Sequence, residues 1–555
     1  MTGLASESYT YDWRGKVDTK TVANGSQSLT TTYAYDEIGR PTSITQKTDG
    51  TQTSAMNYSY NDADNKVSVQ DNAGKTTTLT YDWQNNLTNV LMPNGKSASY
   101  SYDARKLLQS ITDMRSLGTS KSYDYFSRPS GTTFTNGTSV AFSTYDDMDN
   151  LTAMTDANGQ AFAYTYDYAN RVSALAVDGS SKETYVYDTA TNGVGKLASV
   201  SNANASTAYI YDTMGRVTNE SKTIGSATYA TQFSYDNKGN LTTLTMPNSK
   251  AINYAYDAGD RVTTVNADIN GTATDVVGYS YNPIGTVSDI RFGNGINITY
   301  AYNNKNLVES FSIADATGNT LKAESFTYDD AGNVQTQTRQ LVATANTETL
   351  TYAYDDVYQL TGVSYSGGDT QGFTYDDNGN RTAHTSALDA TTYTIAGDSD
   401  QIQSYAANIG VVTLTHDNNG NMTGKTYAAS STTTGTESLT YDYAGHLTKY
   451  TFKDGTYESY DYDSSGNMIK KTDRHGTVTI YHYIAGQIVA LSTQDSALST
   501  IYVWANGQRW RAWILMPTAP SIFTTYTTTC WDRRLRSQTQ AGKSCRSLPG
   551  DRLGI

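Results

Sequence analysis

Aspartate is the residue type with the clearest chemical potential in this chain, because it recurs at near-regular intervals from Asp12 to Asp463. A pair of such carboxylates could act as general acid and base. The recurring aspartates, however, follow a tyrosine and precede a glycine by three residues, as Asp36 precedes Gly39. An aspartate in that place accepts hydrogen bonds from backbone N–H groups, while glycine supplies a positive φ. The spacing therefore favours turn stabilisation over catalysis.

Metal chemistry receives little support from the sequence. The segments DDNGN (Asp376–Asn380) and DNNGN (Asp417–Asn421) resemble calcium loops but lack the full Asp alternation and the closing bidentate glutamate, so weak surface calcium binding is only an alternative. No zinc-type spacing relates the five histidines, which are His384, His416, His446, His475 and His482. His475 and His482 could meet across one hairpin. No nucleophile elbow, phosphate loop or dinucleotide motif occurs. We predict no enzyme, metal or cofactor site.

The elements that position these residues form a long repeat. The second tyrosine of each Tyr-x-Tyr is followed by another most often 21 residues later, with other spacings of 22 to 26. One interval, from Tyr375 to His416, is 41 residues and holds a degenerate unit. The ladder comprises Tyr35, Tyr60, Tyr81, Tyr102, Tyr123, Tyr145, Tyr166, Tyr187, Tyr211, Tyr235, Tyr256, Tyr281, Tyr302, Tyr328, Tyr354, Tyr375, His416, Tyr441, Tyr462 and Tyr483.

Each repeat unit reads as one β-hairpin. A segment such as TTYAYD alternates large and small residues at period two, which is typical of a strand. Asp-x-x-Gly follows as a tight turn, and an apolar residue then opens a second strand, as in GRVTNES. Many units close with a second turn signal such as Asn94-Gly95 or Asn136-Gly137. We expect strands of about six to eight residues.

The glycine position of the turn tolerates a restricted set of residues. Asp and Asn, the non-glycine residues that best adopt the left-handed region, replace glycine at Asp64, Asn85, Asp149, Asn170, Asp260 and Asn306. This substitution pattern preserves a backbone angle and supports the turn. Lys106, Ser127 and Tyr358 depart from the rule.

Tyrosine is abundant, at 46 residues against 11 phenylalanines. The two tyrosines of a Tyr-x-Tyr lie on one face of their strand, and mostly small residues lie on the other. We expect phenols of neighbouring repeats to pack together, at about 0.5–1.5 kcal/mol for each aromatic pair. The residues predicted to carry the repeat include Tyr33, Tyr35, Asp36, Gly39, Tyr211, Asp212, Gly215, Tyr235, Asp236, Gly239, Tyr328, Asp329, Gly332, Tyr375, Asp376, Gly379, Tyr462, Asp463 and Gly466.

Units such as YDEIGRPTSI, YDNKGNLTTL, YDDAGNVQTQ and YDSSGNMIKK resemble the YD repeat of the Rhs family, which includes bacterial polymorphic toxins and the teneurins. The resemblance covers about Tyr9 to Arg509. It implies an all-β fold, in which tandem hairpins form a spiralling sheet and a hollow cocoon that encloses a C-terminal effector in toxin members. Residues 1–8 then read as a truncated lead-in, and the cocoon as incomplete. The family's closing Asp-Pro-x-Gly pattern is not visible, so no autoprotease residue is assigned.

Composition narrows the partners. The net charge of −14 and the lack of a long basic run argue against nucleic acid, and no apolar stretch is long enough to span a membrane. The start of the chain shows no signal peptide. Cys530 and Cys545, the two cysteines, lie near the C-terminus, so no disulfide framework is expected in the repeats.

The last segment, 510–555, departs from the repeat. Residues 511–555 hold seven Lys and Arg against two Asp. A basic disordered tail and a short interaction helix or lid are two interpretations. We favour a third, a frameshift near Trp510. In a frame shifted by two bases, Cys530-Trp531-Asp532 must encode Leu then Gly, as in a His-x-x-Leu-Gly-Ser segment that follows the repeats in Rhs proteins.

Three functions stay open at the sequence level. The first is the structural shell of an Rhs-type toxin whose C-terminal effector is missing from this chain, secreted or at the cell surface in the intact protein. The second is a surface adhesion or carbohydrate-binding protein that binds glycans through tyrosine rings. A glycan-active enzyme is poorly supported without a carboxylate pair outside the turns. Because open sheet edges template pairing, we also expect self-association.

Overall fold

The computed structural model describes residues 6–24, 27–48, 51–247, 249–269, 272–341, 346–408, 410–428, 434–493, 498–505 and 508–512. Within these residues the regular secondary structure is β-strand, and a single sheet of 46 strands contains all of it. No helix in the described part of the chain is long and apolar enough to cross a membrane. The predicted all-β class is therefore confirmed.

We divide the sheet into two halves, a first winding of β1–β24 and a second winding of β25–β46. The strands of the first winding are β1 (Ser6–Tyr11), β2 (Val17–Asn24), β3 (Gln27–Tyr35), β4 (Pro41–Thr48), β5 (Thr51–Tyr60), β6 (Lys66–Gln70), β7 (Thr76–Tyr81), β8 (Leu87–Leu91), β9 (Ser97–Tyr102), β10 (Leu108–Thr112), β11 (Gly118–Tyr123), β12 (Pro129–Phe134), β13 (Ser139–Tyr145), β14 (Leu151–Thr155), β15 (Ala161–Tyr166), β16 (Val172–Val177), β17 (Ser180–Tyr187), β18 (Leu197–Ser201), β19 (Ala205–Tyr211), β20 (Val217–Ile224), β21 (Ala227–Tyr235), β22 (Leu241–Thr245), β23 (Ala251–Tyr256) and β24 (Val262–Ile269).

The strands of the second winding are β25 (Thr272–Tyr281), β26 (Val287–Phe292), β27 (Asn297–Tyr302), β28 (Val308–Ala314), β29 (Thr320–Tyr328), β30 (Val334–Leu341), β31 (Asn346–Tyr354), β32 (Leu360–Tyr365), β33 (Thr370–Tyr375), β34 (Arg381–Ser386), β35 (Thr391–Ile395), β36 (Ile402–Ala407), β37 (Gly410–His416), β38 (Met422–Tyr427), β39 (Gly435–Tyr441), β40 (Leu447–Thr451), β41 (Tyr457–Tyr462), β42 (Met468–Thr472), β43 (Val478–Ile484), β44 (Gln487–Ser492), β45 (Leu498–Ala505) and β46 (Gln508–Ala512).

The chain order of the strands is also their order in the sheet. Each strand pairs antiparallel with its neighbours in sequence, as β3 does with β2 and β4. The connecting turns therefore alternate between the two long edges of one ribbon. We call the edge with the turns that follow Tyr-x-Tyr the Tyr-Asp rim, and the other edge the opposite rim.

The hairpin reading of each repeat agrees with this register. In most units the Tyr-x-Tyr strand ends at the second tyrosine, where a β-bulge shifts the register, as between Ala34 and Tyr35. Strand β43 continues one residue past Tyr483, to Ile484. The degenerate unit also forms a hairpin, β35–β36, with Ile395 in the tyrosine's place. His416 ends β37 with the same bulge. At the C-terminal end, β46 continues through Ala512, so the first residues of the predicted tail belong to a strand, and 513–555 lie outside the described residues.

The two faces of the ribbon differ in burial. In β9 the residues alternate between exposed and half-buried, with Tyr100 and Tyr102 on the half-buried face. Fully buried side chains concentrate in later strands, where Val265, Val277 and Ile290 form a cluster with Val489 and Ala490 of β44. The early repeats thus have little core of their own, and stability there must come from hydrogen bonds and half-buried rings.

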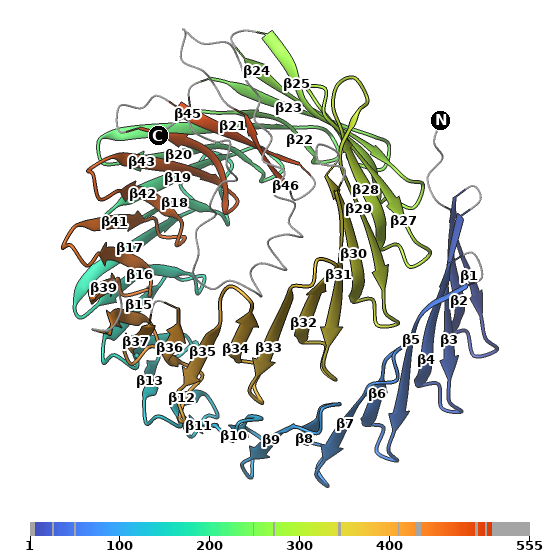
Figure 1. Cartoon of the computed structure of the whole chain (residues 1–555). Helices are drawn as coiled ribbons and strands as arrows, with labels where there is room; N and C mark the ends of the chain where they lie inside the picture. The colour runs from blue at the N-terminus through green and yellow to red at the C-terminus, as the bar shows by residue number, and fades with distance from the viewer. Residues whose placement is uncertain are drawn as a thin grey trace.

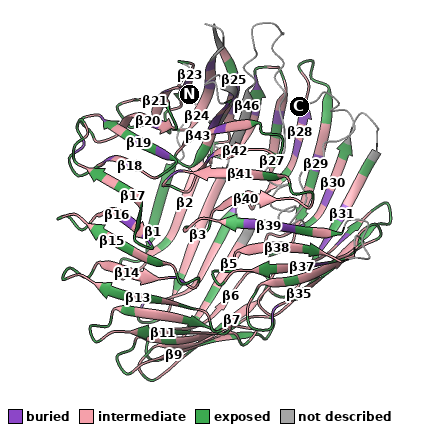
Figure 2. Cartoon of the chain, turned by 90° about the vertical axis from the view of Figure 1, so that its left-hand side faces the viewer, coloured by how far each residue is buried: buried purple, intermediate pink, exposed green. Residues whose placement is uncertain are grey.

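The ribbon winds around a central axis for more than one full turn (Figure 1). Turned by 90°, the molecule shows the series β13–β19 running beside the series β37–β43 (Figure 2). Strands far apart in sequence thus become neighbours across the rims of the ribbon. The predicted spiral of hairpins is therefore confirmed.

Candidate functional site

The Tyr-Asp turn is a repeated hydrogen-bonded unit. In the turn after β3, the Asp36 N–H donates to the Arg40 carbonyl, and the Gly39 N–H donates to the Asp36 carbonyl, both at 3.0 Å. The Asp36 carboxylate accepts from the N–H groups of Ile38 and Arg40 through one oxygen, and from the Arg40 guanidinium through the other. Gly39 has a φ of 85°. The aspartate oxygens are thus occupied by the turn itself.

The other predicted turns have the same geometry. The N–H of Asp212, Asp236, Asp329, Asp376 and Asp463 each donates to the carbonyl four residues on, and Gly215, Gly239, Gly332, Gly379 and Gly466 have positive φ. The exceptions noted in the sequence, Lys106, Ser127 and Tyr358, also have φ between 66° and 68° and close the same turn. At Asp236, hydrogen bonds from Asn240 lower the pKa of the carboxyl below its usual range.

The second tyrosine of each unit binds the preceding unit through its hydroxyl. The Tyr35 hydroxyl donates to the Val17 carbonyl at 2.8 Å, where the second strand of the previous hairpin begins. The same contact joins Tyr211 to Leu197, Tyr235 to Val217, Tyr328 to Val308, Tyr375 to Leu360 and Tyr462 to Leu447. Burial raises the pKa of Tyr328 from 10.0 to about 12, so the phenol remains a hydrogen-bond donor even in alkaline solution where an exposed tyrosine ionises.

Ring packing has a smaller place than the sequence argument gave it. Stacking occurs within one strand, as for Tyr279 and Tyr281, and across strands, as for Phe311 and Phe326. Tyr33 lies on the same strand face as Tyr35, opposite Ile44. The contact that recurs along the ladder is the hydrogen bond from the tyrosine hydroxyl to the first carbonyl of the preceding strand, which is paired with the tyrosine's own strand.

Sequence reasoning missed the residue that directly follows the glycine position. At this place Arg40 binds its own Asp36, reaches Asp64 of the next turn at 2.7 Å, and lies 4.6 Å from the ring centroid of Tyr60. The same stacking on the next tyrosine recurs for Arg128, Arg171, Arg216 and Arg261. These arginines cross-link successive turns along the Tyr-Asp rim. Their fixed place after the glycine position was a readable signal.

The opposite rim of the first winding meets the Tyr-Asp rim of the second, and we call this contact the seam. Its partners lie between 241 and 287 residues apart in sequence. Hydrogen bonds and ion pairs across the seam include those of Asn72 with Asp330, Lys75 with Asp356, Asp71 with Tyr358, Lys96 with Asp377, Asn158 with Asp417, Asp156 with Asn419, Glu183 with Tyr443, Asn202 with Tyr462 and Lys222 with Asp463. Polar turns thus hold the two windings together.

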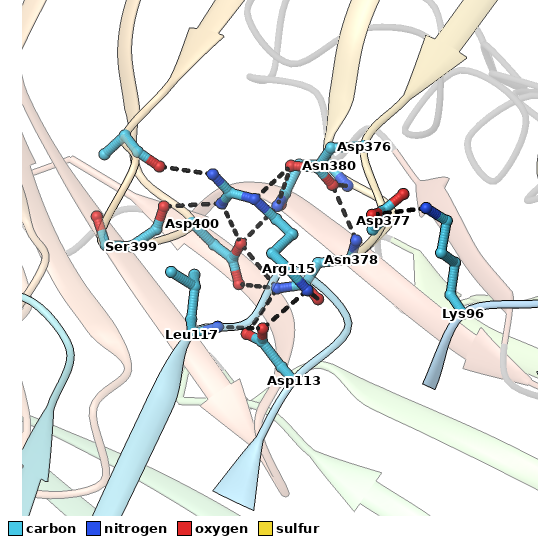
Figure 3. A network of polar contacts seen from close by, with 11 residues as sticks. Lys96, Asp113, Arg115, Leu117, Asp376, Asp377, Asn378, Asn380, Ser399 and Asp400 are labelled. Atoms are coloured by element: carbon cyan, nitrogen blue, oxygen red, sulfur yellow. Dashed lines mark hydrogen bonds and ion pairs between the residues drawn. The ribbon is translucent and has the colours of Figure 1, made fainter. Parts of the chain in front are cut away.

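Arg115 is the densest contact of the seam (Figure 3). Its guanidinium donates to the carbonyls of Ser399 and Ala396, at 2.9 and 2.6 Å. It also pairs with Asp400 at 2.8 Å and with Asp376 at 3.2 Å. Burial would raise the pKa of Asp400, but hydrogen bonds from Arg115, Asn378 and Asn380 outweigh it and lower that pKa. One turn of the first winding therefore binds two successive turns of the second.

Comparison with known proteins identifies the family to which this repeat architecture belongs. The model of the Teneurin YD-shell matches residues 1–193, 144–276 and 294–502, which together cover most of the chain. The chain belongs to the Teneurin YD-shell family. No curated protein sequence matches it.

Solved structures share the YD-shell fold. A crystal structure of TcdB2-TccC3-Cdc42 matches with a TM-score of 0.71 and 15% identity over 94% of this chain and 32% of that chain. A structure of TcdB2-TccC3 matches with a TM-score of 0.71 and 15% identity over 93% and 32% of the two chains. The Photorhabdus luminescens Tc holotoxin pore gives a TM-score of 0.70 and 15% identity over 94% and 31%. At this identity the likeness shows the fold alone, and the YD-shell chain spans about a third of those chains.

The C-terminal end of the YD-shell seam is its most buried part. Lys222 pairs with Asp463 at 2.7 Å, and both side chains are nearly inaccessible. Close by, the His482 ring packs edge-on against Tyr229 and hydrogen-bonds the Ser492 hydroxyl at 2.8 Å. Burial, assisted by the positive charge of Lys222, lowers the pKa of His482 to about 4. Burial raises the pKa of Glu220, which faces Lys222 in the same cluster.

The predicted chemistry elsewhere is placed as follows. Asp417 and Asp376, which head the calcium-like segments, accept hydrogen bonds from Asn421 and Asn380 of their own turns. His475 lies in the exposed turn before β43, whereas His482 is buried within that strand. Among the described residues, no group of His, Cys, Asp and Glu is arranged to hold a metal ion. The hydrogen-bonded networks of polar side chains described above lie in the turns and along the seam.

Proposed function

We propose that this YD-shell chain is the structural scaffold of an Rhs-type toxin, which encloses or presents a C-terminal effector carried on further polypeptide. The seam is the observation that carries the proposal. A ribbon whose second winding is bound edge to edge to its first makes a continuous wall. This role requires turns and rings, which the described residues supply, and needs no reaction at the scaffold itself.

The setting of this role is extracellular. In the proposal the intact protein is secreted or displayed at a cell surface, and the scaffold is not an enzyme. The acidic net charge of −14 supports a wall that neither binds nucleic acid nor adheres to anionic lipid. Solved relatives of the fold carry the TccC3 component in their assemblies, which supports a cargo on the same shell.

Protease protection tests the enclosure. A small folded reporter is fused after Ile555 of the full chain, and in a second variant it directly follows Ala512. The same reporter fused ahead of Met1 is the matched control. We expect digestion of at least one C-terminal reporter to be slower than that of the N-terminal one, because the wall surrounds it. Equal digestion at both ends of the chain would remove the support for enclosure.

A second candidate, adhesion through carbohydrate binding, is favoured by exposed rings on the first winding. Trp13, Trp83 and Tyr168 are almost fully accessible, and aromatic faces stack on sugar rings. A glycan array with the full chain tests this function, with Trp83→Ser as the matched variant. Binding that disappears in the variant favours adhesion, whereas an array without signal leaves the scaffold as the function.

A further inference from the structure

The Tyr-Asp rim of the first winding carries large apolar side chains that point into solvent. Each of these side chains lies one or two residues after the aspartate that begins a turn. They are Trp13, Trp83, Tyr125, Phe126, Met148 and Tyr168. The exposed fractions of Trp13, Trp83 and Tyr125 are 89%, 88% and 91%. Isolated exposed apolar residues are ordinary, but a row of them along one rim is the usual mark of an interaction surface.

The same turn positions already form an interface elsewhere in this molecule. In the second winding, Asp356, Asp377 and Tyr443 directly follow the turn aspartate, and each contacts the first winding. The side chains of the first-winding rim are thus placed where the second winding makes its seam. The rim is a continuation of an interface type that the fold already uses.

A head-to-tail copy would not match this rim chemically. Such a copy would offer the opposite rim of its second winding, where the described turns carry polar residues such as Asp315, Thr317, Asp454 and Arg474. Leu388, with 86% exposure, is the most exposed large apolar side chain described there, and Tyr457, at the start of β41, is partly exposed. An apolar rim set against these turns would desolvate polar groups without pairing them. Another apolar rim is the better match.

The geometry of a spiral permits two such rims to meet along their whole length. The seam shows that the ribbon advances by one ribbon width per winding, so its rim follows a helix. A helix maps onto itself under a two-fold axis perpendicular to its own axis. The rim of a second copy, related by this axis, follows the first rim residue by residue. Because the contact is isologous, it closes at two copies and does not propagate.

The apolar area is sufficient for a stable pair. Aromatic side chains bury about 150–250 Å² each. The five exposed rings of this rim therefore supply on the order of 800 Å² per copy, which is about what each partner contributes to a standard interface. A two-fold axis between the turns at Asp103 and Asp124 sets Trp83 near the partner's Met148. It also sets the exposed Arg105 near the partner's Tyr125 and Phe126, where cation–π contact is favourable.

We propose that the chain forms a closed dimer through the Tyr-Asp rims of two first windings. The occupant of the apolar rim is a second copy of this chain, which is related to the first by a two-fold axis. The proposal does not depend on the enclosure of an effector, because it concerns the outer rim and not the interior.

Sedimentation velocity of the full chain over a range of concentrations tests the proposal. We expect a species of twice the chain mass of 60.4 kDa, equally stable at low and high salt because the contact is apolar. Trp83→Ser and Tyr168→Ser should each weaken dimerisation about tenfold or more, as truncation of aromatic anchors does. Leu388→Ser, on the opposite rim, is the matched control and should leave dimerisation unchanged.

Cross-linking supplies a second measurement that does not depend on loss of association. In a chain with Cys530→Ser and Cys545→Ser, the pair Gln84→Cys and Asp147→Cys, which adjoins Trp83 and Met148 and leaves both side chains in place, should be joined between copies by a short bismaleimide. Placing one cysteine at Leu388 in place of the one at Asp147 should abolish the dimer band. Circular dichroism spectra that match the parent chain show that the variants are folded.

Three results would overturn the dimer. A chain that stays monomeric at high micromolar concentration contradicts it directly. Oligomers that grow beyond two copies indicate head-to-tail stacking or pairing of the open edge strand β1. Association that high salt abolishes, or that survives both rim substitutions, indicates contact through the basic C-terminal segment or the strand edges.

Discussion

The two Tyr-Asp rims of this chain present one local design in two environments. Asp167-Tyr168-Ala169 in the first winding and Asp442-Tyr443-Ala444 in the second have the same sequence and close the same turn. Tyr168 is fully exposed, whereas the Tyr443 hydroxyl donates to the Glu183 carboxylate at 2.7 Å across the seam. Local sequence therefore decides the turn, and the position along the spiral decides whether the turn is an interface.

The difference between the rims also lies in their chemistry. The turns of the second winding carry Asp and Asn where they meet Lys75, Lys96 and Arg115. Several of the corresponding places of the first winding carry Trp, Tyr, Phe or Met, although Glu37, Asp62 and Asp147 also occupy such places. A polar rim can be held inside one chain by ion pairs of defined geometry, whereas an apolar rim binds through buried area. The residues that close a turn and the residues that the turn presents to a partner can therefore vary independently along this ribbon.

The largest effect is expected from loss of the arginine at the centre of the seam. Arg115→Ala leaves Asp376 and Asp400 without their counter-ion and two carbonyls without a donor. Removing one partner of a buried pair costs about 3–5 kcal/mol, and we expect the lower end because Asp400 is half-exposed. Chemical denaturation measures the loss in free energy of unfolding.

Arg474→Ala is the matched control for that loss. Arg474 pairs with Asp454 on the unoccupied opposite rim of the second winding, where both side chains are accessible. An exposed pair contributes about 0–1 kcal/mol, so this substitution should change stability little. Equal losses for the two arginines would show that the seam is no stronger than any surface pair.

Acid should destabilise the buried cluster around His482 at the seam before it affects the exposed rim of the first winding. The pKa of His482 is lowered to about 4 from 6.5 by burial. Protons therefore bind the unfolded chain more readily, and stability falls as pH drops from about 6.5 to about 4, by roughly 3 kcal/mol in all. The raised pKa of Glu220 acts in the opposite direction. His482→Gln keeps a donor toward Ser492 and should flatten the slope of unfolding free energy against pH.

Substitution of an exposed histidine is the control for this pH effect. His475 lies exposed in the turn before β43, and His475→Gln should leave the slope as it is in the parent chain. If both variants keep the full slope between pH 6.5 and 4, the acid sensitivity does not arise from His482. Asp400, whose pKa is depressed by its hydrogen bonds, loses its contribution only below the ordinary aspartate value of 3.8, outside that window.

The turns at Tyr168 and Tyr443 allow the two rims to be compared by removing a single hydroxyl oxygen from each. Tyr443→Phe removes the hydroxyl that binds Glu183, and we expect a loss of about 1.5 kcal/mol because the acceptor is charged. Within a single chain the Tyr168 hydroxyl is exposed, so Tyr168→Phe should change the stability of the monomer by less than about 0.5 kcal/mol. Thermal unfolding of the two variants in parallel, at a concentration at which the chain is monomeric, measures the difference. A Tyr168→Phe loss as large as that of Tyr443→Phe would contradict the exposure of the first rim within one chain.

Much of the local structure could be predicted from the sequence, because the repeat states its rules many times. The aspartate, the left-handed position and the period-two strand depend on neighbours within one hairpin. The substitutions at Asp64 and Asn85 identified a backbone angle that the structure has, with φ of 66° at both. The same reasoning extends to Lys106 and Tyr358, where the surrounding turn imposes the angle on residues that disfavour it.

The seam could not be predicted in this way. Its partners depend on how twist and curvature accumulate over 241 to 287 residues, so no local pattern pairs Lys222 with Asp463. The hydroxyl partner of the second tyrosine in a unit, as for Tyr35 and Tyr211, is likewise a backbone carbonyl, which any residue type can supply and which leaves no trace in the sequence. Arg40 and its equivalents were the exception, since their fixed place after the glycine position was visible and was not interpreted.

The smallest effect concerns backbone strain at the two rims. Lys106, on the first rim, and Tyr358, on the second, both adopt the left-handed region that costs a residue with a side chain about 1–2 kcal/mol. Lys106→Gly relieves this strain, although glycine also loses more chain entropy on folding, so a net gain of up to about 1 kcal/mol is expected. Tyr358→Gly relieves the same strain but removes the hydroxyl that binds Asp71 across the seam, and should lower stability. Opposite signs in chemical denaturation would show that one turn geometry is held for its own sake on the first rim and for the seam on the second, whereas a gain at both positions would mean that the Tyr358 contact contributes little.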